Sequence, residues 1–99
     1  MLVHSVFFWL REDLTDEERA AFRKGVDTLK DIDSAEAVYV GTPAGTAERP
    51  VVDNTYDVGL TVVAKDVAAH DVYQEHPIHQ AFVNEFKSYW TKVTIYDID

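Results

Sequence analysis

Cysteine is absent from the 99 residues, and proline and glycine are scarce, with three and four copies. Without cysteine the chain can hold no disulfide framework, no thiolate metal site and no thiol nucleophile, and such a composition suits a reducing compartment. We therefore predict a cytoplasmic location. Hydrophobic residues make up 46% of the chain and aromatic residues 12%, which is enough to bury one core. The length predicts a single folded domain that covers residues 1–99.

Basic side chains are also few, because nine Lys and Arg residues stand against 18 Asp and Glu residues, a formal net charge of −9. That charge repels phosphate backbones and anionic lipid surfaces, which argues against nucleic acid and membranes as partners. Long hydrophobic runs are missing as well, since His4 and Ser5 interrupt the apolar stretch at residues 1–10. That stretch is typical of a strand, and not of a signal peptide or a membrane span.

The spacing of the apolar residues predicts the element order βαββαβ. Residues 2–10 have the β-branched and aromatic content of a strand, and a capping box at Thr15 opens a helix that runs to about residue 30. Further strands are expected at residues 35–41, at residues 55–64 and at the end of the chain, with a helix broken at Pro77 before the last one. This order predicts an α+β, ferredoxin-like fold, in which both helices cover one face of a four-stranded antiparallel sheet.

The predicted strands are apolar on both faces. In the first strand Val6 and Phe8 alternate with Phe7 and Trp9, so each face of the sheet receives large apolar side chains. Helices on one face leave the other in water, and an exposed apolar sheet face is a strong association surface. We predict a homodimer that packs two sheets face to face as a dimeric α+β barrel. The alternative is a sheet with scattered apolar residues on its outer face.

Two of the four histidines lie in the segment VYQEHPIH at residues 72–79. Proline has no N–H and disfavours helical geometry in the residue before it, so one helix should end near residue 75 and another should begin at Pro77. His76 then lies in the break and His79 in the first turn of the second helix, where the helix dipole favours a neutral imidazole. His79 heads the stripe that contains Phe82 and Trp90, so it should face the sheet.

His4 has the same strand parity as Val6 and Phe8, so His4, Tyr73 and His79 can converge on one aromatic cavity between helices and sheet. These three residues are the candidate catalytic residues, because a neutral imidazole can accept a proton beside a carbonyl substrate. The other residues expected to line the cavity are His76, Val6, Phe8, Phe22, Val58, Phe82 and Trp90.

Two other interpretations of the histidines remain open. They can be structural, with their nitrogens satisfied by the backbone. They can also bind a metal, since His4, His76, His79 and Asp57 are all potential ligands, but no HExxH pattern is present and the segment HPIH straddles a helix break. We predict no metal site and no cofactor. The remaining histidine, His70, is expected to be solvated.

The combination of His4, the stretch YDVGLTVVAKDVAAHDVYQEHPIHQAF and the ending FKSYWTKVTIYDI resembles the stress-responsive A/B barrel domain (Dabb) family over essentially the whole chain. The most specific part is the pattern Y-x-x-H-P-x-H, from Tyr73 to His79. The resemblance implies a ferredoxin-like dimeric barrel. Members of the family include boiling-stable stress proteins, uncharacterised bacterial proteins and a plant polyketide (olivetolic acid) cyclase, which closes a ring by aldol condensation without a cofactor.

The resemblance to that cyclase implies roles for three residues. The position that matches His79 acts there as the general base, the one that matches Tyr73 orients the substrate carbonyl, and the one that matches His4 lies in the same pocket. A third-strand histidine of the cyclase corresponds to Val58 here. The expected function is binding of a small, partly apolar molecule, with cofactor-independent acid/base chemistry. The alternatives are a non-enzymatic stress-response or structural oligomer, and a cofactor-free enzyme similar to the monooxygenases of related barrels.

Overall fold

The computed structural model describes residues 1–99 and contains four strands and three α-helices. In chain order they are β1 (Leu2–Leu10), α1 (Asp16–Asp27), the 3₁₀ helix η1 (Thr28–Asp31), β2 (Ala35–Gly41), β3 (Val58–Ala64), α2 (Val67–Glu75), α3 (Pro77–Phe86) and β4 (Trp90–Ile98). The strands form one antiparallel sheet in the order β2-β3-β1-β4. This is the ferredoxin-like α+β fold, and the predicted fold class is confirmed.

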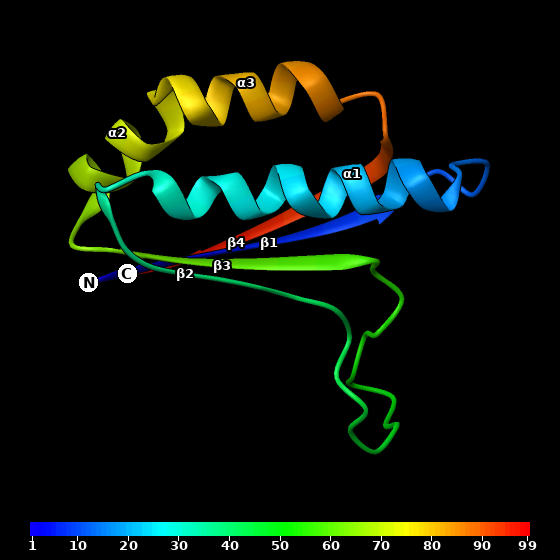
Figure 1. Ribbon diagram of the computed structural model, residues 1–99. Helices are drawn as coiled ribbons and strands as arrows, with labels where there is room; N and C mark the ends of the chain where they lie inside the picture. The colour runs from blue at the N-terminus through cyan, green and yellow to red at the C-terminus, as the bar shows by residue number, and fades with distance from the viewer.

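All three α-helices lie on one face of the sheet (Figure 1). Along β1 buried and half-buried residues alternate strictly, and Leu2, His4, Val6, Phe8 and Leu10 are the buried ones. The predicted parity of β1 is therefore confirmed, and it places His4 on the side of the helices. None of the helices combines the length and the apolar character that crossing a bilayer requires.

The second helical region is broken where proline predicts it. His76 has extended backbone angles, with φ −60° and ψ 139°, and it ends α2 and begins α3, with Pro77 in the first turn. The His76 side chain caps α3, because its Nδ1 accepts a hydrogen bond from the Ile78 N–H at 3.1 Å. The break changes the direction of the chain between Tyr73 and His79, so both side chains reach the same space.

Two boundaries differ from the sequence prediction. Strand β3 begins at Val58, three residues after the predicted start at residue 55. Asp57 does not pair as a strand residue, because its carboxylate and its N–H bind the backbone at the end of β1. The Tyr56 ring packs on Phe7, on the face of the sheet away from the helices. Helix α3 ends at Phe86, and Trp90 is the first residue of β4 rather than the last of a helix. The chain turns there because the Tyr89 N–H donates to the Phe86 carbonyl and the Tyr89 carbonyl accepts from Arg11.

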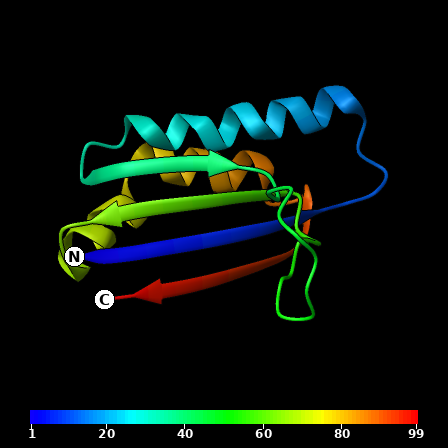
Figure 2. The same ribbon diagram turned by 90° about the horizontal axis from the view of Figure 1, so that it is seen from below.

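The face of the sheet away from the helices, called the open face below, carries no element of the same chain (Figure 2). Its aromatic side chains come from β1, β2, β4 and the segment before β3. The ring centroids of Phe7 and Tyr56 are 4.9 Å apart, and those of Phe7 and Tyr96 are 6.4 Å apart. Tyr96 and Tyr39 are 62% and 73% exposed. The long connection between β2 and β3 extends beyond the sheet on this same side (Figure 1).

Candidate functional site

A cavity of about 290 Å³ lies between the helices and the sheet, at the end where α2 meets α3. It is called the histidine cavity below. Its apolar wall includes the rings of Phe8, Phe82 and Trp90, and its polar groups belong to His4, Tyr73, Gln74 and His79. The volume is at the lower edge of the range for sites that bind small molecules, which is about 300–1,000 Å³. A mostly apolar wall with a few polar groups is typical of such sites.

His79 lies in the first turn of α3 and is half-buried in the wall of the cavity. Its ring centroid is 5.1 Å from that of Tyr73, at an angle of 67°. Burial lowers the pKa of His79 below its ordinary value of 6.5, and positive charge on His4 and His70 would lower it further. The imidazole is therefore neutral at pH 7 and has a lone pair to accept a proton.

Tyr73 is completely buried, and its hydroxyl has no hydrogen-bond partner. Burial raises the pKa of Tyr73 well above its ordinary value of 10, so the hydroxyl stays protonated. A buried hydroxyl without a partner costs about 1–3 kcal/mol of folding free energy. The Tyr73 hydroxyl is therefore free to donate a hydrogen bond to an acceptor atom of a ligand.

His4 is 3% exposed and is held by a carboxylate on the neighbouring strand. Its Nδ1 lies 2.5 Å from Asp97 Oδ1, and the two residues are direct partners in the β1–β4 register. The His4 ring is 6.1 Å from that of Tyr73 and 4.8 Å from that of His70. The structure thus brings together the three candidate catalytic residues around one cavity.

A stress-responsive A/B barrel domain model matches residues 2–99. The chain belongs to the Dabb family. A Dabb protein with a ferredoxin-like fold from Mesorhizobium loti is 24% identical, with a TM-score of 0.78 over 99% of this chain and 94% of that one. The resemblance seen in the sequence is confirmed at the level of the family.

Two further solved structures share the fold of this Dabb chain. The hydroxynitrile lyase of Passiflora edulis is 18% identical, with a TM-score of 0.80 over 98% of this chain and 90% of that one. A dimeric ferredoxin-like protein of unknown function from Thermobifida fusca is 15% identical, with a TM-score of 0.78 over 98% and 88%. No curated protein matches the chain by sequence. At these identities the likeness shows the fold alone.

Three of the residues that the sequence suggested for the cavity of this Dabb domain do not line it. His76 caps α3. Phe22, on α1, is fully buried in the core beneath Phe8 and Phe82, with ring centroids 5.2 and 5.8 Å away. Val58 is buried opposite Phe8 at the far end of β3. Residue spacing along one helix or strand predicts which side chains face the core. It does not predict which of these core-facing side chains border the cavity.

Three polar residues around the cavity of this Dabb chain were not predicted from the sequence. His70 was expected in solvent, but its side chain is only 16% exposed and its ring lies against that of His4. Helix α2 begins at Val67, so His70 and Tyr73 are one turn apart on the same face. Gln74 lines the cavity, and its Oε1 is buried without a partner. Asp97 forms a hydrogen bond with His4. Antiparallel pairing of the first and last strands could have indicated that Asp97 lies opposite His4.

The metal ligands named from the sequence do not form a group. Asp57 accepts a hydrogen bond from the Leu10 N–H at 2.7 Å and lies 3.5 Å from Arg19, so its role in this Dabb domain is to hold the end of β1. His76 is occupied by its helix cap. Of the four candidates only His4 belongs to a group of possible ligands whose atoms lie within 4.8 Å of one another, together with His70 and Asp97.

The pKa of His79 makes a testable prediction for this Dabb protein. The pKa of His79 is lower in the folded protein than the ordinary value of 6.5 expected for the unfolded chain. Between these two pKa values the unfolded chain binds more protons than the folded one. The free energy of unfolding should therefore fall as the pH drops from 6.5 through the folded pKa. Proton NMR of the metal-free protein should give a His79 midpoint below 6.5 when folded and near 6.5 in urea. A folded midpoint at or above 6.5 would contradict the neutral imidazole.

Proposed function

We propose that this Dabb domain binds a small, partly apolar carbonyl compound in the histidine cavity and catalyses proton transfer on it without a cofactor. His79 is the base, Tyr73 is the hydrogen-bond donor to the carbonyl, and His4 completes the polar side of the site. The proposal is supported above all by one observation: His79 and Tyr73 line the same apolar cavity with ring centroids 5.1 Å apart, and the buried Tyr73 hydroxyl has no hydrogen-bond partner.

The pair suits the abstraction of a proton next to a carbonyl. The C–H proton passes to the ring nitrogen of His79, and the electron pair moves to the carbonyl oxygen, which the Tyr73 hydroxyl stabilises. In an aldol closure the enolate carbon then attacks a second carbonyl of the same molecule, and the new alkoxide takes the proton back from His79. A positioned acid or base contributes about 10²- to 10⁴-fold to the rate, which suffices for an activated carbonyl compound.

The cavity surroundings also favour a ligand that both accepts and donates hydrogen bonds. Gln74 Oε1 has no partner and can accept, whereas the Tyr73 hydroxyl can donate. A hydroxyl or enol group and a carbonyl in one small molecule would satisfy both. One structural neighbour is a hydroxynitrile lyase, which supports the capacity of this fold to hold an enzyme.

We also propose that the functional unit is a homodimer. The open face carries Phe7, Trp9, Tyr56 and Tyr96 in contact with one another and with water. Burying such a face contributes about 25 cal/mol per Å². The dimeric ferredoxin-like protein of Thermobifida fusca supports a second copy of the chain as the partner.

The second candidate function is structural, with no substrate. It is favoured by the rings of Phe8, Phe82 and Trp90, which already pack at centroid distances of 5.3 to 6.0 Å around the cavity. In that case the histidines only fix the helix break to the sheet. The two functions differ in whether a ligand enters the cavity.

A ligand screen with matched variants tests the proposal. Small aromatic and polyketide-like compounds are added to the purified protein after its metals have been removed with a chelator, and the shift in Tm is measured for the wild type, His79→Gln and Tyr73→Phe. We expect compounds that raise the Tm of the wild type by several degrees and that lose most of this shift in both variants. Proton exchange at the α-carbon of a binding compound, followed by NMR, should slow about 100-fold or more in His79→Gln.

His76→Gln is the control, because His76 is the nearest histidine outside the cavity. It should lower the Tm of the free protein slightly and leave the ligand-induced shift unchanged. Tyr73→Phe should raise the stability of the free protein by about 1 kcal/mol, since it removes an unpartnered buried hydroxyl. If no compound shifts the Tm and Tyr73→Phe destabilises the protein, the structural function stands in place of the enzymatic one.

A further inference from the structure

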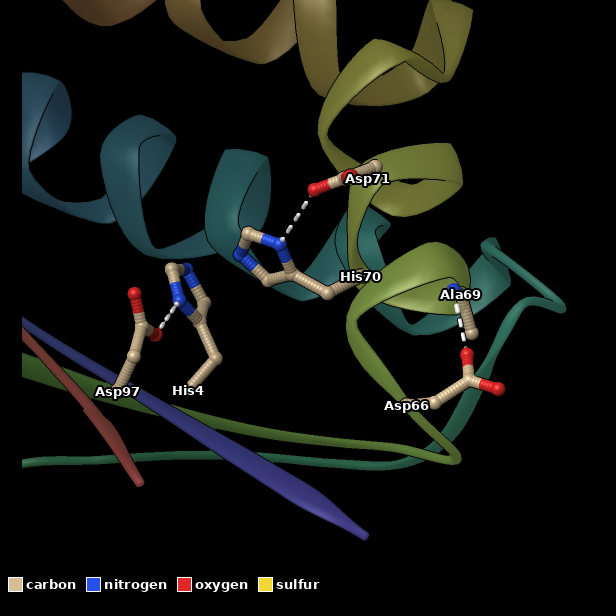
Figure 3. A network of polar contacts seen from close by, with 6 residues as sticks. All are labelled: His4, Asp66, Ala69, His70, Asp71 and Asp97. Atoms are coloured by element: carbon tan, nitrogen blue, oxygen red, sulfur yellow. Dashed lines mark hydrogen bonds and ion pairs between the residues drawn. The ribbon is translucent and has the colours of Figure 1, made fainter. Parts of the chain in front are cut away.

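Beside the histidine cavity, three side chains from three elements face one small space. They are His4 on β1, His70 on α2 and Asp97 on β4, and one ligand atom of each lies within 4.8 Å of the other two (Figure 3). We propose that these three residues bind one divalent transition-metal ion of the Zn²⁺ class. The sequence predicted no metal, because α2 brings His70 to this place only through its packing.

The His70 side chain has one ring nitrogen free to bind a metal ion. Its Nδ1 lies 3.2 Å from Asp71 Oδ1, whereas its Nε2 is buried and has no partner. In Figure 3 that second nitrogen is directed toward His4 and Asp97. Metal-bound histidines commonly donate their other N–H to a carboxylate, which fixes the tautomer and leaves the free lone pair on the metal side. The Asp71–His70 pair has this arrangement.

His4 and Asp97 form the other half of the site. They are opposite each other in the antiparallel register of β1 and β4, so their backbone positions are fixed by the sheet. His4 Nδ1 and Asp97 Oδ1 lie 2.5 Å apart, within hydrogen-bond distance. A metal ion that binds between the two atoms displaces the hydrogen of this bond, which leaves to solvent as a proton. The metal-bound form then contains an imidazole protonated only on Nε2 and an ionised carboxylate.

The donor set fits the ion class. Two imidazole nitrogens and one carboxylate oxygen are ligands that Zn²⁺ and related ions accept, with bonds of about 2.0–2.2 Å. Tetrahedral ligand atoms around such an ion are roughly 3.4 Å apart. Binding therefore requires the Asp97 carboxylate to rotate away from His4, from 2.5 Å, and His70 to close in, both by small side-chain rotations. Three protein ligands leave a fourth position open. Because His4 also lines the histidine cavity, the ion would lie at its end.

Zinc binding to the purified protein tests this site directly. After removal of metals with a chelator, ZnCl₂ is titrated by calorimetry, and we expect one ion per chain. His70→Gln and Asp97→Asn should each weaken the affinity about 100-fold or more, and Asp71→Asn about 10-fold. Co²⁺ in place of Zn²⁺ should give the visible absorption of a four-coordinate ion in the wild type, and this absorption should be lost in His70→Gln.

His76→Gln is again the control and should bind zinc as the wild type does. The proposal is overturned if zinc binds the wild type, His70→Gln and Asp97→Asn with equal affinity. It is also overturned if one equivalent of zinc, added to the Co²⁺-loaded protein, leaves the Co²⁺ spectrum unchanged and, added to the metal-free protein, leaves the Tm unchanged. Its failure is distinct from that of the proposed function, because the ligand-induced Tm shift is measured on metal-free protein and depends on His79 and Tyr73.

Discussion

Replacement of Gly25 by valine should lower the free energy of unfolding by about 3 kcal/mol, equivalent to a fall in Tm of roughly 10–20 °C for a domain of this size. Gly25 lies in α1, and a Cβ built on it would stand 2.3 Å from Cε2 of Phe86. The Phe86 ring cannot move away freely, because it is 4% exposed and packs against Phe22, Phe82 and Tyr89. Urea unfolding followed by circular dichroism at constant protein concentration measures the change.

Lys24→Val is the matched control, because Lys24 is the exposed neighbour of Gly25 on the same helix. It should change the stability by less than about 0.5 kcal/mol. The double variant Gly25→Val with Phe86→Ala should be more stable than the sum of the two single effects, since the new side chain fills part of the space left by the ring. Simple additivity would show that the close approach of α1 to α3 does not decide the effect.

The role of Gly25 illustrates what the sequence does not reveal. In the sequence, a glycine inside a helical pattern indicates only lower helix stability. In the structure, the missing Cβ of Gly25 leaves room for the Phe86 ring, so that α1 and α3 can pack closely. By contrast, the capping box at Thr15 and Glu18 and the break at Pro77 depend on a few neighbouring residues, and the structure has both as predicted. Local patterns predicted the start of α1 and the break before α3, but long-range packing determines which elements touch and where β3 begins.

The candidate site follows the same division. The inward position of His4 was predictable from the alternation in β1, because Val6 and Phe8 fix the parity. The roles of His70 and Asp97 were not predicted. His70 on α2 contacts His4 on β1, and Asp97 is 93 residues from His4 in the chain, on another strand. Such contacts depend on the sheet order and the strand register, which the alternation of residues within one strand does not supply.

Glutamate at position 7 should convert the proposed homodimer into a single chain. Phe7 lies on β1 at the centre of the open face, between Gly59 of β3 and Thr94 of β4. A two-fold dimer contains each substitution twice, so two carboxylates would be buried without partners. Each such burial costs several kcal/mol, so we expect the dissociation constant to rise more than about 1,000-fold. Light scattering at micromolar concentration should give twice 11.2 kDa for the wild type and 11.2 kDa for Phe7→Glu.

Two further variants separate loss of the interface from loss of the fold. Tyr96→Glu changes an exposed residue of the same face and should also dissociate the dimer, whereas Val51→Glu, in the exposed connection before β3, should leave it intact. All three variants should keep the circular dichroism of the wild type, because the helix layer and its core lie on the other side of the sheet. A wild type that scatters as a single chain would contradict the dimer, and the aromatic open face would then need a different partner, since water is a poor contact for Phe7, Tyr56 and Tyr96 together.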